Sequence, residues 1–283
     1  MGGKTIVMNI LITGASSYVG ASIYSRLKDK YYVVGTYHSH QLFPELEYLD
    51  ITNQKNVRDF VLVTKPNVII HVAANASGSW CDQNPEHAIA INQSGTKYIV
   101  DAANAVNSKV ILISSFAVAN TESLYGRTKI VSEQYVKEVK AGYIILRPSL
   151  IVGFSPNTTN DRPFNRFLRN IVEGTPAVYD TSWKFQPTWL RHLDEVIEAI
   201  IERGITNEII PISVPELTTR SDLAKDILSQ FNITVYAEDK HDSTPTFSED
   251  LKKLKDLKLP EYTYSEMVGG IVEEIKEYLQ KRK

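Results

Sequence analysis

The chain has 283 residues, 43% of them hydrophobic and 23% charged, which predicts a globular protein with one large core, or with a core and a smaller lobe. A formal net charge of −2 gives no electrostatic reason to expect nucleic acid as the main partner. The single cysteine, Cys81, excludes a disulfide framework and a multi-cysteine metal site, and we expect no bound metal.

Composition also predicts the cellular setting. One cysteine fits a reducing, cytoplasmic compartment, and Cys81 is interpreted as a small packed residue, with a nucleophile as the alternative. No run of about 18 apolar residues occurs, so no membrane span or membrane partner is expected. The start "MGGKTIVMNILITG" lacks the apolar region of a signal peptide. Residues 1–7 are either a native extension or the result of a different start site.

The first half of the chain alternates short apolar runs with helical patterns. Strands are predicted at residues 8–14, 31–37, 48–52, 67–74, 109–115 and 142–153. Helices are predicted at residues 18–30, 53–65, 84–106 (bent near Gly95) and 125–139. Strands alternating with helices of about 10 to 20 residues predict an α/β fold. Right-handed crossovers make it a doubly wound parallel sheet, the Rossmann fold.

After Gly153 the pattern is less regular. A polar loop at 155–163 precedes predicted helices at 164–174, 194–204, 221–231 and 264–283. No linker composition separates the two parts, so we expect a dinucleotide-binding domain at 1–153 and an interleaved substrate lobe at 154–283. The lysine-rich segment "DLKKLKDLKL" is predicted to be a solvated helix face.

The segment "ILITGASSYVGASI" places glycines in the turn between the first strand and the first helix. Backbone N–H groups and the helix N-terminus at such a turn can hold a dinucleotide pyrophosphate. Gly14 permits the tight turn and Gly20 permits close helix–strand packing. The spacing matches G-x-x-G-x-x-G with Ser17 in place of the middle glycine. A purely structural turn is the alternative.

The end of the second strand, "VVGTYHSHQ", carries Thr36, His38, Ser39 and His40 but no acidic residue. An acidic residue at this place would bind the ribose 2′-hydroxyl and repel a 2′-phosphate. Hydroxyl and imidazole donors therefore favour NADP(H), and NAD(H) is left open. Alternatively, the two histidines are ordinary loop residues.

Tyr125 and Lys129 are spaced i, i+4 and share one face of a predicted helix. A phenol near pKa 10 needs a shift of about three units, about 4 kcal/mol, to exchange a proton at neutral pH. A nearby ammonium supplies such a shift by favouring the phenolate. Ser114 and Ser115 end a strand at the sheet edge where sites form. A surface pair is the alternative, but the strand-end serines and the dinucleotide turn favour a proton-transfer site.

The segments "TGASSYVG", "LDIT", "VIIHVAA", "AIAINQSGT", "ILISS", "YGRTK" and "LRPSLIVG" follow one another between residues 8 and 153. In this order they resemble the extended short-chain dehydrogenases/reductases. The segments "VVGTYHS" and "NPEHAIAIN", with residues 164–196, most resemble the dTDP-4-dehydrorhamnose reductases. The regulatory β subunit of methionine adenosyltransferase, a non-catalytic partner protein, belongs to the same subgroup.

The resemblance implies a role for each matching residue. Ser115 matches the active-site Ser/Thr, Tyr125 the acid/base and Lys129 its partner. Asn92 matches the asparagine that steadies the lysine through a water. Tyr125 and Lys129 are also implied as cofactor contacts, and the lysine can hold the nicotinamide ribose. Further cofactor contacts are implied at the pyrophosphate turn, the adenine pocket, the turn after the fourth strand and the nicotinamide segment, namely at Gly14, Ser16, Ser17, Tyr18 and Val19, at Asp50 and Ile51, at Ala73, Ala74 and Asn75, and at Pro148 and Ser149.

The chain departs from the reductases beside the substrate. Phe116 stands where they usually have an aspartate, and Leu150 where they often have a tryptophan. Ser115 and Tyr125 are ten residues apart, whereas the reductases have a much longer loop. Candidates for the sugar-nucleotide pocket, by position only, are Trp80, Ser115, Asn165, Arg166, Trp183 and Gln186, with packing or surface placement as the alternative.

Three functions are left open. The first is an NADPH-dependent reductase of a keto-sugar nucleotide, in which Tyr125 donates the proton, Lys129 lowers its pKa and Ser115 orients the C4 carbonyl oxygen. The second is another enzyme of this fold, such as an epimerase or dehydratase, because fold does not fix substrate. The third is a non-catalytic, cofactor-binding regulatory subunit. The expected partner is a small-molecule substrate, and a homodimer is left open.

Overall fold

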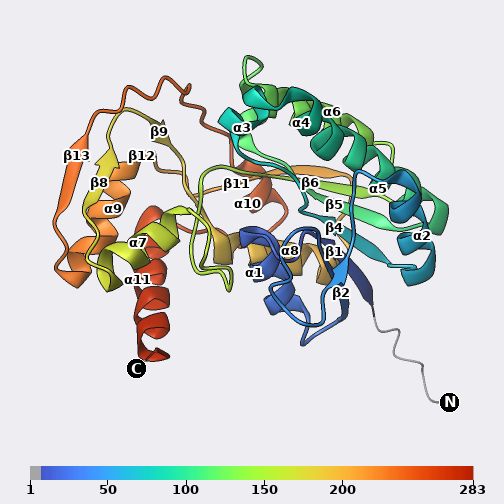
Figure 1. Ribbon diagram of the computed structural model, residues 1–283, viewed down its shortest axis with the longest axis horizontal. Coiled ribbons are helices and arrows are strands. Elements are labelled where there is room, and N and C mark those ends of the chain that lie inside the picture. Colours follow the sequence, from blue (N-terminus) through green and yellow to red (C-terminus); the bar gives the residue numbers. More distant parts are fainter. Residues whose placement is uncertain (1–7, 283) are drawn as a thin grey trace. The chain divides into compact units, whose positions relative to one another are not determined.

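The computed structural model describes residues 8–282 (Figure 1). Residues 1–7 and 283 lie outside the described part, and so does the question of whether residues 1–7 are a native extension. Contacts between Cα atoms divide the chain into two units. The first ends at Arg147 and also takes in Ile200–Ile210, and the second comprises Pro148–Ala199 and the residues from Pro211 on. The predicted domains, 1–153 and 154–283, stay a prediction.

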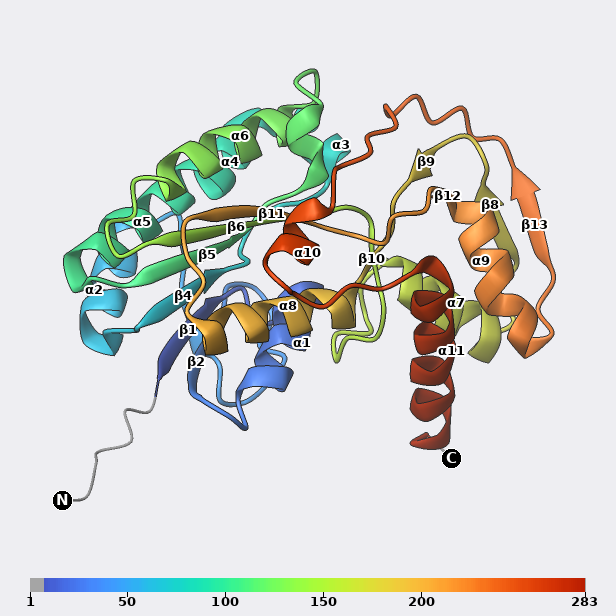
Figure 2. The ribbon, with the colours of Figure 1, turned by 180° about the vertical axis from the view of Figure 1, so that it is seen from behind.

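The first unit is built on a sheet to which seven strands of the described chain contribute, in the order β11-β6-β5-β4-β1-β2-β3 (Figures 1 and 2). The pairs β1–β2, β1–β4, β2–β3, β4–β5 and β5–β6 are all parallel. The strands are β1 (Asn9–Thr13), β2 (Tyr32–Tyr37), β3 (Glu47–Tyr48), β4 (Val68–His71), β5 (Lys109–Ile113), β6 (Tyr143–Pro148) and β11 (Glu208–Ile212).

Helices cover both faces of this sheet. One face carries α2 (Gln54–Thr64), α4 (Pro85–Ile89), α5 (Gly95–Val106) and α6 (Leu124–Val136), and the other carries α1 (Tyr18–Leu27) (Figures 1 and 2). The predicted doubly wound α/β sheet is therefore confirmed. A short helix, α3 (Gly78–Gln83), follows β4.

Apolar runs explain why these segments form central strands. Ile10, Leu11 and Ile12 of β1 are 0% exposed, as are Ile69 and Ile70 of β4. Successive side chains of a strand point to opposite faces, so consecutive buried residues require cover on both faces. Each such side chain contributes about 1.5–3 kcal/mol on burial. The buried central strands fix the positions of the polar residues that follow them.

Two predicted strands differ from the structure. The strand predicted at 48–52 ends at Tyr48, because Asp50 Oδ1 accepts hydrogen bonds from Thr52 N (2.8 Å) and Thr52 Oγ1 (2.7 Å) and turns the chain. The strand predicted at 142–153 is divided. Its first part is β6, and its second part, β7 (Ile151–Val152), pairs with β10 (Thr188–Trp189) in the second unit.

The predicted bend near Gly95 takes the form of a π-helical turn. Residues Ala90–Ser94 form this turn between α4 and α5. The carbonyl oxygen of Asn92 accepts the hydroxyls of Thr96 (2.7 Å) and Ser132 (2.6 Å), two side-chain bonds that compete with the regular helical pattern. Such π turns occur often at functional sites, and Asn92 is one of the predicted site residues.

The second unit contains the four predicted helices and three small sheets. Its helices are α7 (Pro163–Val172), α8 (Leu190–Arg203, whose last turn belongs to the first unit), α9 (Arg220–Leu228) and α11 (Tyr264–Gln280). Besides β7–β10, β8 (Ala177–Asp180) pairs with β13 (Val235–Glu238), and β9 (Lys184–Phe185) with β12 (Thr218–Thr219). The lysine-rich segment forms α10 (Lys252–Asp256), whose lysines are exposed, as predicted, while Leu254 is buried.

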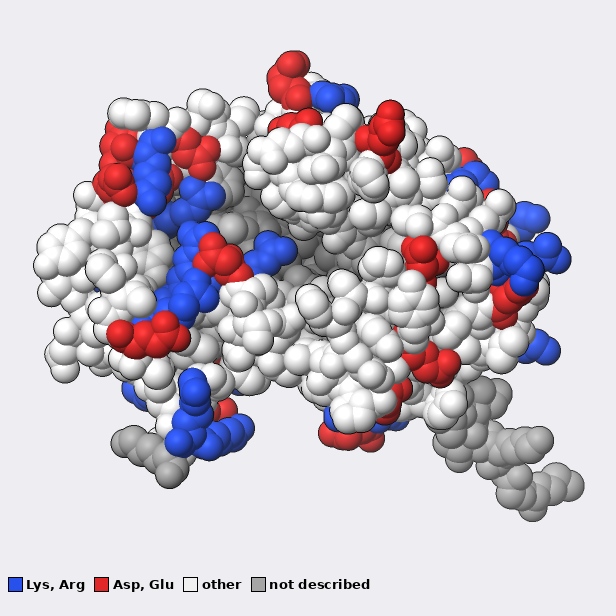
Figure 3. Space-filling view, in the orientation of Figure 1, with Lys and Arg blue, Asp and Glu red and all other residues white. Residues whose placement is uncertain are grey.

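Charged side chains of both signs lie close together on the face of the chain that Figure 3 shows. In the second unit, Asp161 pairs with Arg166 and Arg169, and Arg220 pairs with Asp180 and Asp242. These three arginines are thus matched by acidic groups. Across residues 8–282, no helix combines the length and the apolar character that crossing a membrane requires.

Candidate active site

The candidate site of the first unit lies at the carboxyl edge of the sheet. Thr13 ends β1, His71 ends β4, and Ser114 and Ser115 directly follow β5. Because these strands are parallel neighbours, their carboxyl ends meet at the same edge. Ligand sites of open α/β sheets form at this edge.

The glycine turn after β1 is shaped for close backbone approach. Gly14 has φ +70°, and a Cβ there would lie 3.0 Å from Cα and N of Ala73. A Cβ on Gly20 would lie 2.1 Å from the carbonyl oxygen of Gly14, so helix α1 can begin this close to the turn only with glycine. Ser17, which replaces the middle glycine, is the N-cap of α1, and its Oγ accepts the Gly20 N–H at 3.0 Å.

The other residues predicted to bind the cofactor fall into two groups. Ser17, His38 and Ser39 are exposed, and His38 stacks on Tyr48 with ring centroids 5.9 Å apart. By contrast, the Thr36 hydroxyl is buried and donates to the carbonyl oxygen of Ile12 at 3.4 Å, so this side chain serves the fold.

Several of them also hold the fold around the turn. Ser16 Oγ accepts the Leu42 N–H at 3.2 Å, Tyr18 is buried, Val19 is half-buried, and Ile51 is buried where a Cβ on Gly95 would touch it. Ala74 and Asn75 are half-buried in the turn after β4. In the second unit, Ser149 N, next to Pro148, donates to Thr188 Oγ1 at 2.9 Å.

Ser115, Tyr125 and Lys129 belong to the strand end and helix that the sequence predicted. Ser115 is the N-cap of a 3-10 helix, Phe116–Ala119, and its Oγ accepts the Ala117 N–H at 3.1 Å. A hydroxyl that accepts in this way keeps its own proton for donation. Tyr125 is half-buried in the first turn of α6, and Lys129 Nζ lies 6.0 Å from the centroid of its ring.

Lys129 is a buried cation. Its side chain is only 4% exposed, and Nζ donates to the carbonyl oxygen of Ile113, the last residue of β5, at 2.9 Å. Burial lowers the pKa of Lys129 from 10.5 to about 8, and the carboxylate of Glu133, one helical turn further along, acts in the opposite direction. The lysine therefore remains largely protonated at neutral pH.

Glu133 is itself fixed by three donors. Ser114 Oγ donates to Oε1 at 2.7 Å, and Arg147 binds both oxygens, with Nε–Oε1 at 2.9 Å and Nη2–Oε2 at 2.7 Å. Ser114, the other strand-end serine, is thus committed to this buried network. This leaves Ser115 as the serine that can reach a substrate.

Asn92 joins two parts of the site. Its Oδ1 accepts the Asn75 N–H at 2.9 Å, and its Nδ2 donates to Asn75 O at 3.0 Å and to Thr128 Oγ1 at 3.1 Å. Asn92 thereby ties the turn after β4 to helix α6, which carries Lys129. The predicted link from Asn92 to the lysine through a water stays a prediction.

The short connection from Ser115 to Tyr125 is held against α6. A Cβ on Gly126 would lie 2.3 Å from the carbonyl oxygens of Ala117 and Asn120, so only glycine allows this contact. Arg127 Nη1 donates to the carbonyl oxygens of Thr121 (2.9 Å) and Glu122 (2.7 Å). Ten residues, 114–123, therefore suffice to join strand β5 to helix α6.

The predicted substrate residues of the second unit are engaged in internal contacts. Asn165 Nδ2 donates to Asn157 O and Asn160 O, and Arg166 forms a bidentate pair with Asp161. Trp183 stacks on Phe185, with Arg220 over its ring. Gln186 donates to Pro215 O and accepts the Glu249 N–H. These contacts favour packing roles, and their part in substrate binding stays a prediction, as does that of Trp80, half-buried on α3.

Sequence reasoning missed His71. Its ring is 1% exposed, with Nδ1 2.8 Å from Thr13 Oγ1 and Nε2 3.1 Å from Thr96 Oγ1. Burial, and to a lesser extent the Lys129 charge, lower the pKa of His71 to about 3, so the ring is neutral at physiological pH. The signal was available in "VIIHVAA", because a polar residue that ends a buried strand needs partners.

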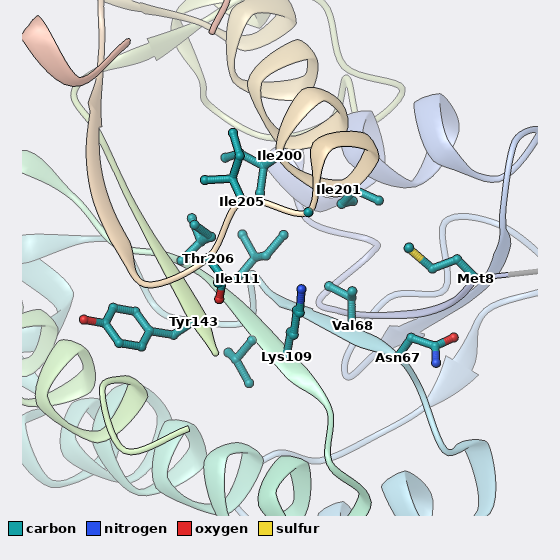
Figure 4. A pocket seen from close by; sticks show the side chains of 13 residues that line it. Met8, Asn67, Val68, Lys109, Ile111, Tyr143, Ile200, Ile201, Ile205 and Thr206 are labelled. Atoms are coloured by element: carbon teal, nitrogen blue, oxygen red, sulfur yellow. The ribbon is translucent and has the colours of Figure 1, made fainter. Parts of the chain in front are cut away.

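A pocket of about 130 Å³ lies at the other end of the same sheet (Figure 4). Val68, Lys109 and Tyr143 line it together with Ile200 and Ile205, and its wall is mostly apolar. Asn67 and Lys109 stand at the amino ends of β4 and β5. The pocket is therefore separate from the candidate site at the carboxyl edge.

The chain is similar to several known proteins. It is 29% identical over 214 residues to "Methionine adenosyltransferase 2 subunit beta" of Xenopus tropicalis, an alignment that covers 71% of this chain and 64% of that protein. It is 30% identical over 158 residues to the dTDP-4-dehydrorhamnose reductase of Aggregatibacter actinomycetemcomitans, covering 51% of this chain and 52% of the other.

A crystal structure shows the same fold. The dTDP-4-dehydrorhamnose reductase of Bacillus anthracis in complex with NADP superimposes with a TM-score of 0.80 at 21% identity, over 95% of this chain and 99% of the other. The family described as "RmlD substrate binding domain" matches residues 8–279, nearly the whole chain. The protein therefore belongs to the RmlD substrate binding domain family.

Proposed function

We propose that this protein is an NADP(H)-dependent reductase of a keto-sugar nucleotide. The observation that carries the proposal is the buried ammonium of Lys129 one helical turn from Tyr125, with Ser115 at the end of the neighbouring strand. Burying a charge costs free energy unless it is compensated. A site that must lower the pKa of a phenol needs such a charge, whereas a simple packing position does not.

NADP(H) is the proposed cofactor, and the residues at the glycine turn fit it. Added Cβ atoms on Gly14 and Gly20 would meet neighbouring backbone at 3.0 Å or less, so the turn is built for close approach. The N-terminus of α1, capped by Ser17, suits the pyrophosphate. His38 and Ser39 are exposed where the 2′-phosphate would be bound. The B. anthracis reductase is a complex with NADP, which supports the choice. Bound NADPH supplies a hydride.

The chain's own residues handle the proton and the oxygen. Ser115 donates its hydroxyl proton in a hydrogen bond to the C4 carbonyl oxygen of the substrate. Tyr125 gives its phenolic proton to the same oxygen as negative charge develops there. The Lys129 ammonium stabilises the phenolate that remains, which brings the phenol pKa toward neutrality. The expected compartment is the cytoplasm.

A second candidate function is a dinucleotide-binding regulatory subunit. The similarity to a protein named as a subunit of methionine adenosyltransferase favours it, and so does the short connection from Ser115 to Tyr125. The intact trio of Ser115, Tyr125 and Lys129 favours the enzyme. An epimerase or dehydratase of the same fold is an alternative enzyme class. Tightly bound NAD in the purified protein would favour it.

The test is a screen of NADPH oxidation with dTDP-, UDP- and GDP-linked 4-keto sugars. The variant Tyr125→Phe removes only the phenolic proton and is expected to lower kcat at least about 100-fold. Tyr135→Phe, on the same helix, is the matched control and is expected to stay within about twofold of the wild type. Equal rates for the wild type and Tyr125→Phe would refute the catalytic assignment. NADPH binding without turnover of any keto sugar would favour the regulatory subunit.

A further inference from the structure

His71 lies at the centre of a buried hydrogen-bond chain in the first unit. The chain runs from Thr13, beside the glycine turn, through the imidazole to Thr96 and on to the carbonyl oxygen of Asn92. Thr13, His71, Asn92 and Thr96 are each no more than 2% exposed. Unmade hydrogen bonds are costly in such a place, so each donor and acceptor must be matched.

Matching them fixes the direction of every bond. Thr96 has one hydroxyl proton and donates it to Asn92 O at 2.7 Å, so it must accept from His71 Nε2–H. In the neutral ring Nδ1 is then an acceptor, and Thr13 donates its hydroxyl proton to it. Thr13 Oγ1 in turn accepts the Ala73 N–H at 3.3 Å. The pattern assigns the neutral Nε2–H tautomer to His71.

The same series of hydrogen bonds continues to helix α6, which carries Tyr125, the proposed proton donor. Asn92 Nδ2 donates to Thr128 Oγ1, and Thr128 donates to the carbonyl oxygen of Tyr125 at 2.8 Å. Ser132 Oγ joins Asn92 O and Thr128 O. At the other end, Gly14 is packed against Ala73, whose N–H is bound by Thr13 Oγ1. One imidazole thus connects the turn after β1 to helix α6.

We propose that His71 is a positioning residue that couples the dinucleotide turn after β1 to Asn92 and helix α6. With 1% of the residue exposed, the imidazole is assigned no contact with substrate or cofactor. The inference rests on the proposed function, because it takes the glycine turn as the dinucleotide site. The consequence is that removing a hydrogen-bond partner of the imidazole on the Asn92 side alters dinucleotide binding at the turn after β1.

A double-mutant cycle on dinucleotide binding tests this coupling. Thr13→Val and Thr96→Val each remove one hydroxyl partner of His71 at nearly constant volume. The dissociation constant of NADPH is measured by fluorescence, together with the melting temperature. Ser108→Ala is the control, because it removes a buried hydroxyl at the amino end of β5, outside the chain of bonds.

We expect Thr13→Val to weaken NADPH binding about tenfold, and Thr96→Val about threefold although Thr96 lies on the far side of the imidazole. The double variant should bind about as weakly as Thr13→Val alone, because either change interrupts the same path. The coupling is refuted if Thr96→Val changes the NADPH dissociation constant no more than Ser108→Ala does. It is also refuted if the effects of Thr13→Val and Thr96→Val on that constant multiply in the double variant. Failure of the wild type to bind any dinucleotide would instead refute the proposed function, and this inference with it.

Nitrogen-15 NMR of the histidine rings tests the tautomer without reference to activity. His71→Asn identifies the His71 signals among the six histidines. We expect a protonated Nε2 and an unprotonated Nδ1 at neutral pH. A protonated Nδ1 would reverse the bond to Thr13 and overturn the assigned path.

Discussion

Replacing Lys129 with methionine should abolish activity and yet stabilise the protein. The wild-type pKa of Lys129 is lowered from 10.5 to about 8 by burial. This lowering of the pKa corresponds to about 3 kcal/mol that the buried charge costs at neutral pH. Loss of the hydrogen bond from Lys129 Nζ to Ile113 O lowers the free energy of unfolding by about 1 kcal/mol. Lys129→Met is therefore expected to raise the free energy of unfolding by about 2 kcal/mol at pH 7.

The stability difference between the wild type and Lys129→Met depends on pH. Between pH 8 and 10.5 the unfolded chain binds the lysine proton more tightly than the folded chain does. The unfolding free energy of the wild type therefore rises through this window relative to that of Lys129→Met, and the advantage of the variant disappears by about pH 10.

Urea unfolding at several pH values measures the difference, with NADPH oxidation in parallel. Lys97→Met is the control, because Lys97 pairs with Asp101 at the surface and its replacement should change stability by about 0.5 kcal/mol or less. A Lys129→Met protein less stable than the wild type at pH 7, with the same difference at pH 10, would refute the account of Lys129 as a costly buried charge.

Three further predictions concern other parts of the first unit. Gly126→Ala should destabilise the protein by more than about 2 kcal/mol, since the new Cβ would lie 2.3 Å from two carbonyl oxygens, and a melting temperature within a degree of the wild type would contradict it. His71, whose pKa is lowered to about 3, should make the unfolding free energy fall as pH drops from 6.5 toward 3, and His71→Asn should show a shallower fall in acid titration. Val68→Ile adds a methylene toward the pocket at the amino edge and should raise stability by about 0.5–1 kcal/mol in urea unfolding with unchanged NADPH affinity, whereas a loss would mean that the pocket cannot accept it.

The central strands could be predicted because their apolar runs leave few alternatives. Segments such as Ile10–Ile12 are buried on both faces, and this burial is visible in the sequence as a continuous apolar run. The end of β3 could not be predicted in the same way. It depends on one side chain, Asp50, turning back onto Thr52, and the residues "YLDIT" are equally compatible with a longer strand.

The positions of the candidate site residues in the fold could be read from the sequence better than their contacts, and their roles stay predictions. The spacing of Tyr125 and Lys129 predicted that both lie on one helix face. In the structure Lys129 Nζ lies 6.0 Å from the centroid of the Tyr125 ring. Ser114 donates to Glu133, which Arg147 also binds, and these partners are 19 and 14 residues from Glu133 in the sequence, beyond the reach of a local pattern. The internal hydrogen bonds of Asn165 and Gln186 depend likewise on loops whose paths no local pattern specifies.

The cost of the Lys129 charge also bears on the choice between an enzyme and a regulatory subunit. A site that made no use of the charge could place methionine at this position and gain about 2 kcal/mol, since an apolar side chain of similar length suits a buried site. Pairing Lys129 with Tyr125 is useful where the phenol must ionise. The buried cation thus favours proton transfer by Tyr125 as the proposed function of this site. Loss of turnover in a Lys129→Met protein of raised stability would separate that chemical role from any structural one.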